Sequence, residues 1–523
     1  MKNKTRATLE RVKNLKNQYR LVAEGIGVGV LTGLLVSLFR MALERAELLR
    51  SSVLLAASED ALSAAAALAM LFAACFAAWY ALRRVPLCGG SGIPQVKGEL
   101  LGQMEQNWWQ IIAAKFIGGV CAIGGGLSLG REGPSIQLGA MVGKGFSRLS
   151  GNLKTEEKLL MTCGAGAGLS GAFCAPLAGV VFALEELHKN FSTDVLVLTM
   201  AASVASDFVS SYIFGLTPVF GLYVDGKLPL SRYWMVLLLG IVLGLFGVFY
   251  NWMTARIQDL YGKIPRRSMR VLVPFLLVIP LAVCYPLVLG SGHHLVGQIA
   301  AGSFAIKALL ILLAVKFLFS IISFGCGVPG GIFLPLLVLG AITGGLFAMA
   351  AGGLAGYEEL YLTNFVILGM AGYFSAIVRS PITGVILITE MSGDFKNFLP
   401  LAVVALAAYL TADLLGGQPI YDQLLHRMLA GGADYGTDEE TRSHKILLES
   451  DVYIGSRMDG EKIEKMLLPP GCLVVSVQRE QKEIVPSGAT VLAGGDKLIL
   501  LCSQGDASVV EEKLNNICRR IKM

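Results

Sequence analysis

The chain has 523 residues, of which 54% are hydrophobic and 16% are charged, and its mean hydropathy is +0.63. Because an ordinary soluble domain is about 25% charged, this composition excludes a soluble globular protein and predicts a polytopic membrane protein. The net charge of +6 follows from the bias of Lys and Arg toward the cytoplasmic face, so it requires no nucleic-acid partner.

The N-terminal segment 1–20 contains seven Lys and Arg and one Glu. It predicts a short basic helix at the cytoplasmic face rather than a cleavable signal. Apolar runs of about the length needed to cross roughly 30 Å of hydrocarbon follow from Leu21 to Leu415. They include 61–82, 109–129, 194–214, 234–252, 271–291, 306–324 and 363–378. Gly interrupts many of them, which is typical of helices that begin or end inside the membrane.

The membrane body, expected over 21–428, contains an internal repeat. One offset pairs Pro134 with Pro335, Gly139 with Gly340, Ala140 with Ala341, Gly143 with Gly344 and Phe146 with Phe347. A nearly equal offset pairs Gly164 with Gly369, Pro176 with Pro381, Gly179 with Gly384, Val180 with Val385 and Glu185 with Glu390. Duplicated halves with interrupted helices are typical of secondary transporters, whose site lies at the repeat interface near the midplane.

Four Gly- and Pro-containing segments stand out: GGSGIP (89–94), GREGP (130–134), GGIFLP (330–335) and GGQPIY (416–421). Glycine permits unusual dihedral angles, and proline is tolerated in the first turn of a helix. The first three segments therefore predict helix N-termini, which expose unpaired N–H groups and carry about half a positive charge. Several of them converging at mid-membrane would bind a small inorganic anion without holding it too tightly.

Glu132 is the acid inside the second segment. A carboxylate there can occupy the anion position itself and leave it when protonated, and ionisable groups at this depth are usually functional. The alternative is a surface acid or one paired with Arg131. The residues alone leave open whether Glu185–Glu186 are functional or merely solvated, whether Tyr421 is a ligand or an interfacial tyrosine, and whether Ser91 is only an N-cap.

In this order, GSGIP, GREGP, GGIFLP and a late Tyr resemble the motifs of the CLC family of chloride channels and chloride/proton antiporters, over essentially the whole membrane body. The resemblance implies an all-α inverted repeat of about 18 tilted or broken helices, assembled as a homodimer with one pore per subunit. By motif position, Ser91 and Tyr421 would give their hydroxyls to a bound chloride. Ile332 and Phe333 would give their backbone N–H groups. Glu132 would be the gate, closing the external side when ionised and carrying protons from outside.

The segment PLAGVVFALEELHKNF resembles the family stretch with two adjacent acids, of which the second, Glu186, is the internal proton-transfer residue. Antiporters keep this acid and most channels replace it, so the resemblance implies chloride/proton exchange, with Glu185 structural. Ser at position 91 favours chloride over nitrate, and Arg131 and Tyr421 argue against the fluoride-exporting branch. Lys115, Lys144 and Arg131 either steer anions inward or are ordinary packing charges.

No cofactor is expected beyond chloride as bound substrate, and no metal, since Cys and His show no ligand spacing. The expected location is a bacterial-type inner (plasma) membrane, with both termini cytoplasmic. A passive voltage- or pH-gated chloride channel is the runner-up. A sensor or regulatory subunit would have damaged pore motifs, which are intact here. An intramembrane enzyme lacks HExxH and any Ser–His arrangement.

After a polar linker, 429–445, the pattern changes over 446–523. CLVVSVQ, EIVPSGATVL and GGDKLILLC predict strands and ASVVEEKLNNICRRI a closing helix, so a small soluble α+β domain is expected. The stretch from LPPG to LILLC resembles a TrkA C-terminal domain, the ligand-binding module of potassium transport regulators. No GxGxxG half precedes it, so NAD binding is not expected. The expected role is regulatory or dimer-stabilising, with an unidentified small ligand.

Overall fold

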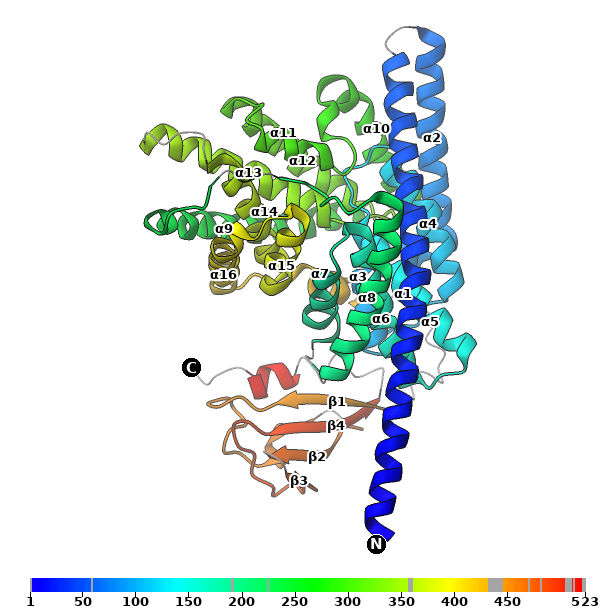
Figure 1. Cartoon of the computed structure of the whole chain (residues 1–523), viewed down its shortest axis with the longest axis vertical. Helices are drawn as coiled ribbons and strands as arrows, with labels where there is room; N and C mark the ends of the chain where they lie inside the picture. The colour runs from blue at the N-terminus through cyan, green and yellow to red at the C-terminus, as the bar shows by residue number, and fades with distance from the viewer. Residues whose placement is uncertain are drawn as a thin grey trace. The chain divides into compact units, whose positions relative to one another are not determined.

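The computed structural model describes residues 2–523 except 58–59, 190–191, 223, 225, 356–360, 431–444, 469–470, 480–481, 504–509, 511–512 and 520–523. It divides into two compact units (Figure 1). The first, Met1–Leu100 with Gln106–Gly431, is helical, and the second, Leu101–Glu105 with Gly432–Met523, contains a small sheet.

The helical unit contains long spans and short broken helices. They are α1 (Lys2–Ala56), α2 (Ala61–Arg84), α3 (Ile93–Leu100), α4 (Trp108–Gly124), α5 (Glu132–Ser150), α6 (Lys154–Phe173), α7 (Pro176–Phe182) continued by a π turn (Ala183–His188), α8 (Thr193–Phe214), α9 (Tyr233–Gly262), α10 (Arg267–Cys284), α11 (His293–Ala300), α12 (Ile306–Gly325), α13 (Phe333–Ala355), α14 (Leu362–Val378), α15 (Pro381–Ser392), α16 (Phe398–Leu414) and α17 (Ile420–Ala430).

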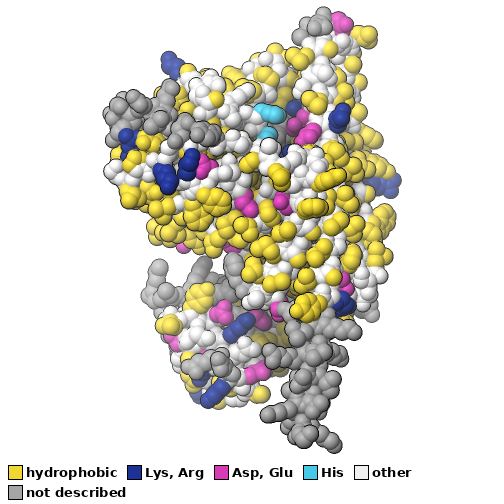
Figure 2. All heavy atoms as spheres, viewed as in Figure 1, with side chains coloured by type: hydrophobic (Ala, Val, Ile, Leu, Met, Phe, Trp, Pro, Cys, Tyr) yellow, Lys and Arg dark blue, Asp and Glu magenta, His cyan; other side chains and the backbone are white. Residues whose placement is uncertain are grey.

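Among the described residues, 8 helical segments are long and apolar enough to cross a membrane. Trp108–Gly124, Leu362–Val378 and Pro381–Ser392 are apolar but shorter. Hydrophobic side chains cover most of the helical unit on the face shown in Figure 2, and charged ones are sparse there. The polytopic, mostly helical class predicted from composition is therefore confirmed.

Two boundaries differ from the sequence expectation. The basic N-terminal segment is not a separate helix, because α1 continues unbroken from Lys2 and meets no Gly or Pro before Gly25. The apolar run 271–291 is helical only as far as Cys284, since Pro286 follows. Proline disfavours helical backbone at the residue before it and lacks the N–H that would continue the hydrogen-bond ladder.

The predicted repeat appears as two equivalent helix crossings. Gly139 of α5 meets Gly164 of α6, and Gly340 of α13 meets Gly369 of α14. A Cβ on Gly139 would lie 2.0 Å from the Gly164 oxygen, and a Cβ on Gly340 would lie 2.4 Å from the Gly369 oxygen. Any side chain would separate the helices, so these aligned glycines let the two backbones touch in each half.

The second unit contains a four-stranded antiparallel sheet in the order β1-β4-β2-β3. The strands are β1 (Lys445–Asp451), β2 (Leu473–Arg479), β3 (Lys482–Ile484) and β4 (Lys497–Ser503). Val477 of β2 is paired with Leu498 of β4, and both side chains are buried in the small core of this unit.

Strand β1 was not predicted, because its sequence KILLESD begins in the polar linker. The predicted strand EIVPSGATVL was too long: only its start belongs to β3, since Pro486 lacks an N–H to pair and a turn closes from Ser487 to Thr490. The closing helix is described at Val510 and at 513–519, where it is helical and ends in a π turn. Its other residues lie outside the described part of the chain.

Candidate functional site

Three helices of the unit begin beside one another. Helix α3 begins at Ile93, α5 at Glu132 and α13 at Phe333, which confirms the three N-termini predicted from the Gly/Pro segments. The loop before α5 is paired with the loop before α13, because Gly130 and Gly331 exchange backbone hydrogen bonds of 2.6 and 2.8 Å. Three N-termini with unpaired N–H groups therefore meet around one point.

The loop before α3 joins the same assembly. Gly330 N–H donates to the Gly90 carbonyl at 3.0 Å. Gly92 has a φ of +94°, in the region that favours glycine, and a Cβ there would lie 2.5 Å from Gln137 Oε1. A Cβ on Gly133 would lie 2.4 Å from Ser91 Oγ. Glycines are thus required for the Ser91 loop and α5 to come this close.

Several polar atoms at this point are buried and unsatisfied. Ser91 Oγ, the Tyr421 hydroxyl and both carboxylate oxygens of Glu132 have no hydrogen-bond partner among the described residues. Ser91 is 2% exposed, and Glu132 and Tyr421 are 0% exposed. Native proteins leave few such groups, and clusters of them mark functional or ligand-binding positions. Two hydroxyl donors gathered at helix N-termini are suited to an acceptor with negative charge.

Ile332 directly precedes α13 and Phe333 begins it, and backbone N–H groups at a helix start lack intrahelical partners. Both side chains are fully buried. The Phe333 ring packs against Phe374 with centroids 4.7 Å apart and against Phe173 at 5.5 Å. This aromatic packing holds the N-terminus of α13 in place.

The Glu132 carboxylate lies beside the same helix N-terminus. A Cβ on Gly130 would lie 2.2 Å from Glu132 Oε2 and 3.0 Å from Leu334 N, so glycine makes room for the acid. Arg131 is not the ion-pair partner of Glu132 in the described residues: its guanidinium faces Glu44 at 3.8 Å. The alternative of a simple Arg131–Glu132 pair is not what the structure contains.

Glu186 lies in a second buried polar cluster. Lys97 Nζ is 2.8 Å from Glu186 Oε1, and Ser380 Oγ donates to Glu186 Oε2 at 3.1 Å. Lys97 also pairs with Asp422, whose other oxygen is 3.0 Å from Lys189 Nζ. Opposite charges therefore alternate from Glu186 through Lys97 and Asp422 to Lys189. Sequence reasoning missed Lys97, although it follows GSGIP by one helical turn, and Asp422, although it directly follows Tyr421.

Tyr421 lies at the start of α17 and directly precedes Asp422, which pairs with Lys97 in the Glu186 cluster. The six predicted site residues are all buried, and they come from five separate segments: the loop before α3, the start of α5, the π turn after α7, the start of α13 and the start of α17. They are Ser91, Glu132, Glu186, Ile332, Phe333 and Tyr421. Glu185 faces elsewhere and accepts from Thr383 N at 2.8 Å, consistent with a structural role.

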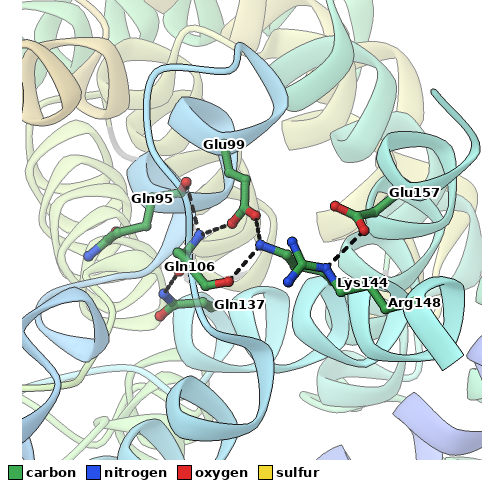
Figure 3. Close-up of polar contacts among 7 residues, drawn as sticks. All are labelled: Gln95, Glu99, Gln106, Gln137, Lys144, Arg148 and Glu157. Carbon is green, nitrogen blue, oxygen red and sulfur yellow. Dashed lines mark hydrogen bonds and ion pairs between the residues drawn. The ribbon is translucent and has the colours of Figure 1, made fainter. Parts of the chain in front are cut away.

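A further buried network anchors α3 (Figure 3). Lys144 Nζ is paired with Glu99 and donates to the Gln106 carbonyl at 2.6 Å. Gln106 Nε2 donates to Glu99 Oε2 at 2.8 Å, and Gln137 Nε2 donates to Gln106 Oε1 at 2.6 Å. Because its charge is compensated inside this network, Lys144 is a packing residue here.

Lys115 holds the loop that carries Ser91. Its fully buried ammonium donates to the Cys88 carbonyl at 2.9 Å and to the Gly90 carbonyl at 2.7 Å. In the other half Lys316 does the same, donating to the Val288 and Gly290 carbonyls at 2.9 Å each. Each repeat therefore contains one buried lysine that fastens the loop before a short helix.

Residues 73–413 match the family described as voltage gated chloride channel. The H(+)/Cl(-) exchange transporter ClcA of Vibrio cholerae serotype O1 is 35% identical over 433 residues, which cover 79% of this chain and 91% of that protein. The chain belongs to the CLC family of chloride channels and transporters. The CLC family is a transport family, so the chain is not an enzyme.

Other CLC proteins are similar to this chain in sequence and in fold. The H(+)/Cl(-) exchange transporter ClcA of Klebsiella pneumoniae is 36% identical over 363 residues, covering 67% of this chain and 76% of that protein. A solved slow cyanobacterial Cl-/H+ antiporter has a TM-score of 0.75 and 28% identity, covering 79% of this CLC chain and 99% of its own. A eukaryotic CLC transporter with 20% identity and a TM-score of 0.67 shares the fold. Residues 447–515 match the TrkA-C domain, which confirms that resemblance.

Proposed function

We propose that this CLC protein is a secondary active transporter that exchanges chloride for protons across the membrane. The observation that carries the proposal is that Glu132, Glu186 and the Tyr421 hydroxyl are all buried, with no hydrogen-bond partner for Glu132 or Tyr421 among the described residues. Relatives at 35–36% identity are named H(+)/Cl(-) exchange transporters, which supports the same activity.

Chloride would bind where the helix N-termini meet. Ser91 Oγ and the Tyr421 hydroxyl would donate hydrogen bonds to it, joined by the N–H groups of Ile332 and Phe333. These groups are neutral, so chloride is held by partial charges and hydrogen bonds and released readily. The supporting observation is that both hydroxyls are buried without a protein partner among the described residues.

Glu132 would be the gate and external proton acceptor. When ionised, its carboxylate competes for the N–H groups that chloride needs, because it lies beside Leu334 N at the start of α13. Protonation removes its charge and with it the attraction to the helix N-terminus. The neutral side chain then leaves the anion path, so each opening toward the outside is coupled to a proton.

Glu186 would pass protons between the gate and the cytoplasm. Its ion pair with Lys97 at 2.8 Å keeps the carboxylate in place until a proton arrives. Lys97 has a second acid, Asp422, to balance its charge once Glu186 becomes neutral. A buried lysine left without any acid would be costly, so this second partner makes the protonated state of Glu186 accessible.

The test is paired chloride and proton flux in proteoliposomes, for wild type and Glu186→Gln. The wild type should drive protons uphill when given a chloride gradient, and the variant should retain chloride flux without proton movement. Acid-driven chloride exchange that is undiminished in the variant contradicts the proton role of Glu186. Wild-type chloride flux without uphill proton movement would instead favour the alternative, a passive voltage- or pH-gated channel.

The oligomeric state, the membrane location and the role of the C-terminal domain are also proposals. We infer a homodimer in a bacterial-type inner membrane with both termini cytoplasmic, and a regulatory or dimer-stabilising role for the TrkA-C domain with an unidentified small ligand. Exposed apolar side chains on α8, α15 and α16, such as Phe208, Ile382 and Leu406, would pack against the partner subunit in such a dimer. Crosslinking of cysteines introduced there, in native membranes, tests the dimer.

A further inference from the structure

A basic cleft opens where the end of α2 meets the start of α10. It has a volume of about 270 Å³ and is lined by Trp79, Leu82, Arg83, Arg266, Arg267 and Ser268. The two helices are antiparallel neighbours here, so three arginines from distant parts of the sequence share one small space. Nothing in the transport mechanism uses this cleft.

The cleft is built to attract negative charge. Arg83, Arg266 and Arg267 are exposed, and no acidic side chain lines the cleft. No ion pair is found for any of the three within the described residues. The Arg83 guanidinium lies over the Trp79 ring, 5.3 Å from its centroid, which orients the planar group at one wall. Guanidinium groups bind phosphate oxygens in a bidentate manner, and Arg is preferred over Lys for that geometry.

An apolar groove continues from the cleft between the same two helices. It is lined by Leu68, Leu71, Phe72, Cys75, Leu272, Phe275, Leu276 and Ile279. Leu71, Cys75 and Phe275 are buried and form its floor, whereas Phe72 and Leu276 are exposed and form its sides. The groove is therefore a shallow apolar strip that a neighbour on the lipid-facing surface can lie against.

The dimensions fit a lipid. Phe72 and Arg83 are eleven residues apart on α2, which is about 16 Å along the helix. Half of the hydrocarbon core is about 15 Å deep. A chain that begins at the arginines and follows the groove would thus reach the middle of the bilayer. Trp79 and Tyr80 lie at the boundary, where aromatic side chains are enriched.

We propose that this cleft and groove bind one anionic phospholipid. The arginines bind the phosphate of the headgroup, and one acyl chain lies in the groove between α2 and α10. The bias of basic residues assigns the lipid to the cytoplasmic leaflet. Free inorganic phosphate could bind the arginines but would not occupy the groove. An experiment that detects an acyl chain in the groove therefore distinguishes a phospholipid from free phosphate.

The test uses Trp79 in the full-length protein as its own probe. Vesicles contain either phosphatidylglycerol or phosphatidylcholine with brominated acyl chains, which quench nearby tryptophans. The contribution of Trp79 is the difference between wild type and Trp79→Phe. We expect brominated phosphatidylglycerol to quench it more strongly than brominated phosphatidylcholine. Each arginine replaced by Gln should reduce that preference by about fivefold, as expected for one basic side chain at an anionic surface.

The chain offers a matched control. Arg256 is exposed and lies over Trp252, 5.4 Å from its centroid, but does not line the cleft. Arg256→Gln should leave the preference at Trp79 unchanged, whereas Arg83→Gln and Arg267→Gln should lower it. Equal quenching of wild-type Trp79 by the two lipids overturns the proposal without any variant. A preference that millimolar inorganic phosphate abolishes contradicts the role of the groove, since the arginines alone would then hold the headgroup.

Discussion

Glu185 and Glu390 each cap the helix that carries the other. The Glu185 carboxylate accepts from Thr383 N of α15 at 2.8 Å, and the Glu390 carboxylate accepts from Ala178 N of α7 at 2.8 Å. The two acids occupy equivalent positions in the repeat. Each half therefore supplies a carboxylate that accepts hydrogen bonds from the N-terminus of a helix in the other half. Because Glu185 is anchored in this way, the next residue, Glu186, is held toward the interior.

Removing one of these caps should weaken the membrane body. Glu390→Ala leaves N–H groups of Leu177 and Ala178 without their acceptor, which should cost about 1–2 kcal/mol of stability. The measurement is the temperature at which the detergent-solubilised protein loses its monodisperse gel-filtration peak. Glu185→Ala should lower it by a similar amount. An unchanged midpoint in both variants would show that the caps contribute nothing to stability.

Glu132→Gln should uncouple chloride from protons. The amide has the shape of the protonated acid and cannot ionise, so the gate stays in its open form. Chloride flux into proteoliposomes should persist and lose its dependence on external pH, while chloride-driven proton movement should disappear. Proton movement at the wild-type rate in this variant would remove Glu132 from the proton path.

Lys97→Met should reduce both proton transport through Glu186 and the stability of the fold. It leaves the buried Glu186 without its cation, while Asp422 keeps its pair with Lys189, and breaking a buried ion pair typically costs about 3–5 kcal/mol. The double variant Lys97→Met/Glu186→Gln should recover stability, because it removes the uncompensated acid as well. Lys189→Met is the control, since Lys189 is exposed and its ion pair among the described residues is with Asp422 rather than Glu186. A single Lys97 variant as stable and as coupled as wild type would exclude this role.

Tyr421→Phe should weaken chloride binding. The substitution keeps the buried ring and removes the hydroxyl that has no protein partner among the described residues. One hydrogen bond to a charged group is worth about 1.5 kcal/mol or more, so the chloride dissociation constant measured by calorimetry should rise about tenfold. Tyr261→Phe, whose hydroxyl donates to the Ile322 carbonyl, should leave it unchanged. Equal affinities for wild type and Tyr421→Phe would remove this hydroxyl from the anion site.

The TrkA-C domain should lose stability in acid through Asp496. Burial alone would raise the pKa of Asp496, but hydrogen bonds from Arg479 and Ala493 N, with the Arg479 charge, hold the pKa below its usual value. Asp496 therefore stabilises the fold above its ordinary pKa of about 3.8, and the stabilisation is lost as pH falls through the lower folded value. Labelling of the buried Cys502 thiol should accelerate in that range when the reagent is an aromatic disulfide such as 4,4′-dithiodipyridine, which reacts with thiols in acid.

The Asp496 prediction has a matched pair of variants. In Arg479→Gln, Cys502 labelling should begin to accelerate at a higher pH than in wild type, because the substitution removes two hydrogen bonds of 2.7 Å to Asp496. Lys497→Gln removes the exposed ion pair with Glu449 and should leave the labelling at the wild-type pH. If the two variants behave alike, the acid sensitivity does not come from Asp496.

Much of the site could be predicted because its signals are local. Gly92 and Gly133 are required by backbone geometry and close approach, so the loops at Ser91 and Glu132 are recognisable in the chain itself. The hydrophobic runs follow from the length of a membrane span. The nearly equal offsets from Gly139 to Gly340 and from Gly164 to Gly369 reveal the duplication without any contact being known.

The sequence by itself determined the membrane class, the three helix N-termini and the duplicated halves, since each depends on neighbouring residues or on a repeat of them. Only the tertiary structure decided that Lys97 pairs with Glu186, 89 residues away, and that Asp422 balances it. It also decided that Arg83 shares a cleft with Arg267, and that β1 completes the small sheet. Such pairs depend on how helices and strands pack. A buried charge is stable only beside a partner, and the spacing of residues in the chain does not show which distant residue that partner is.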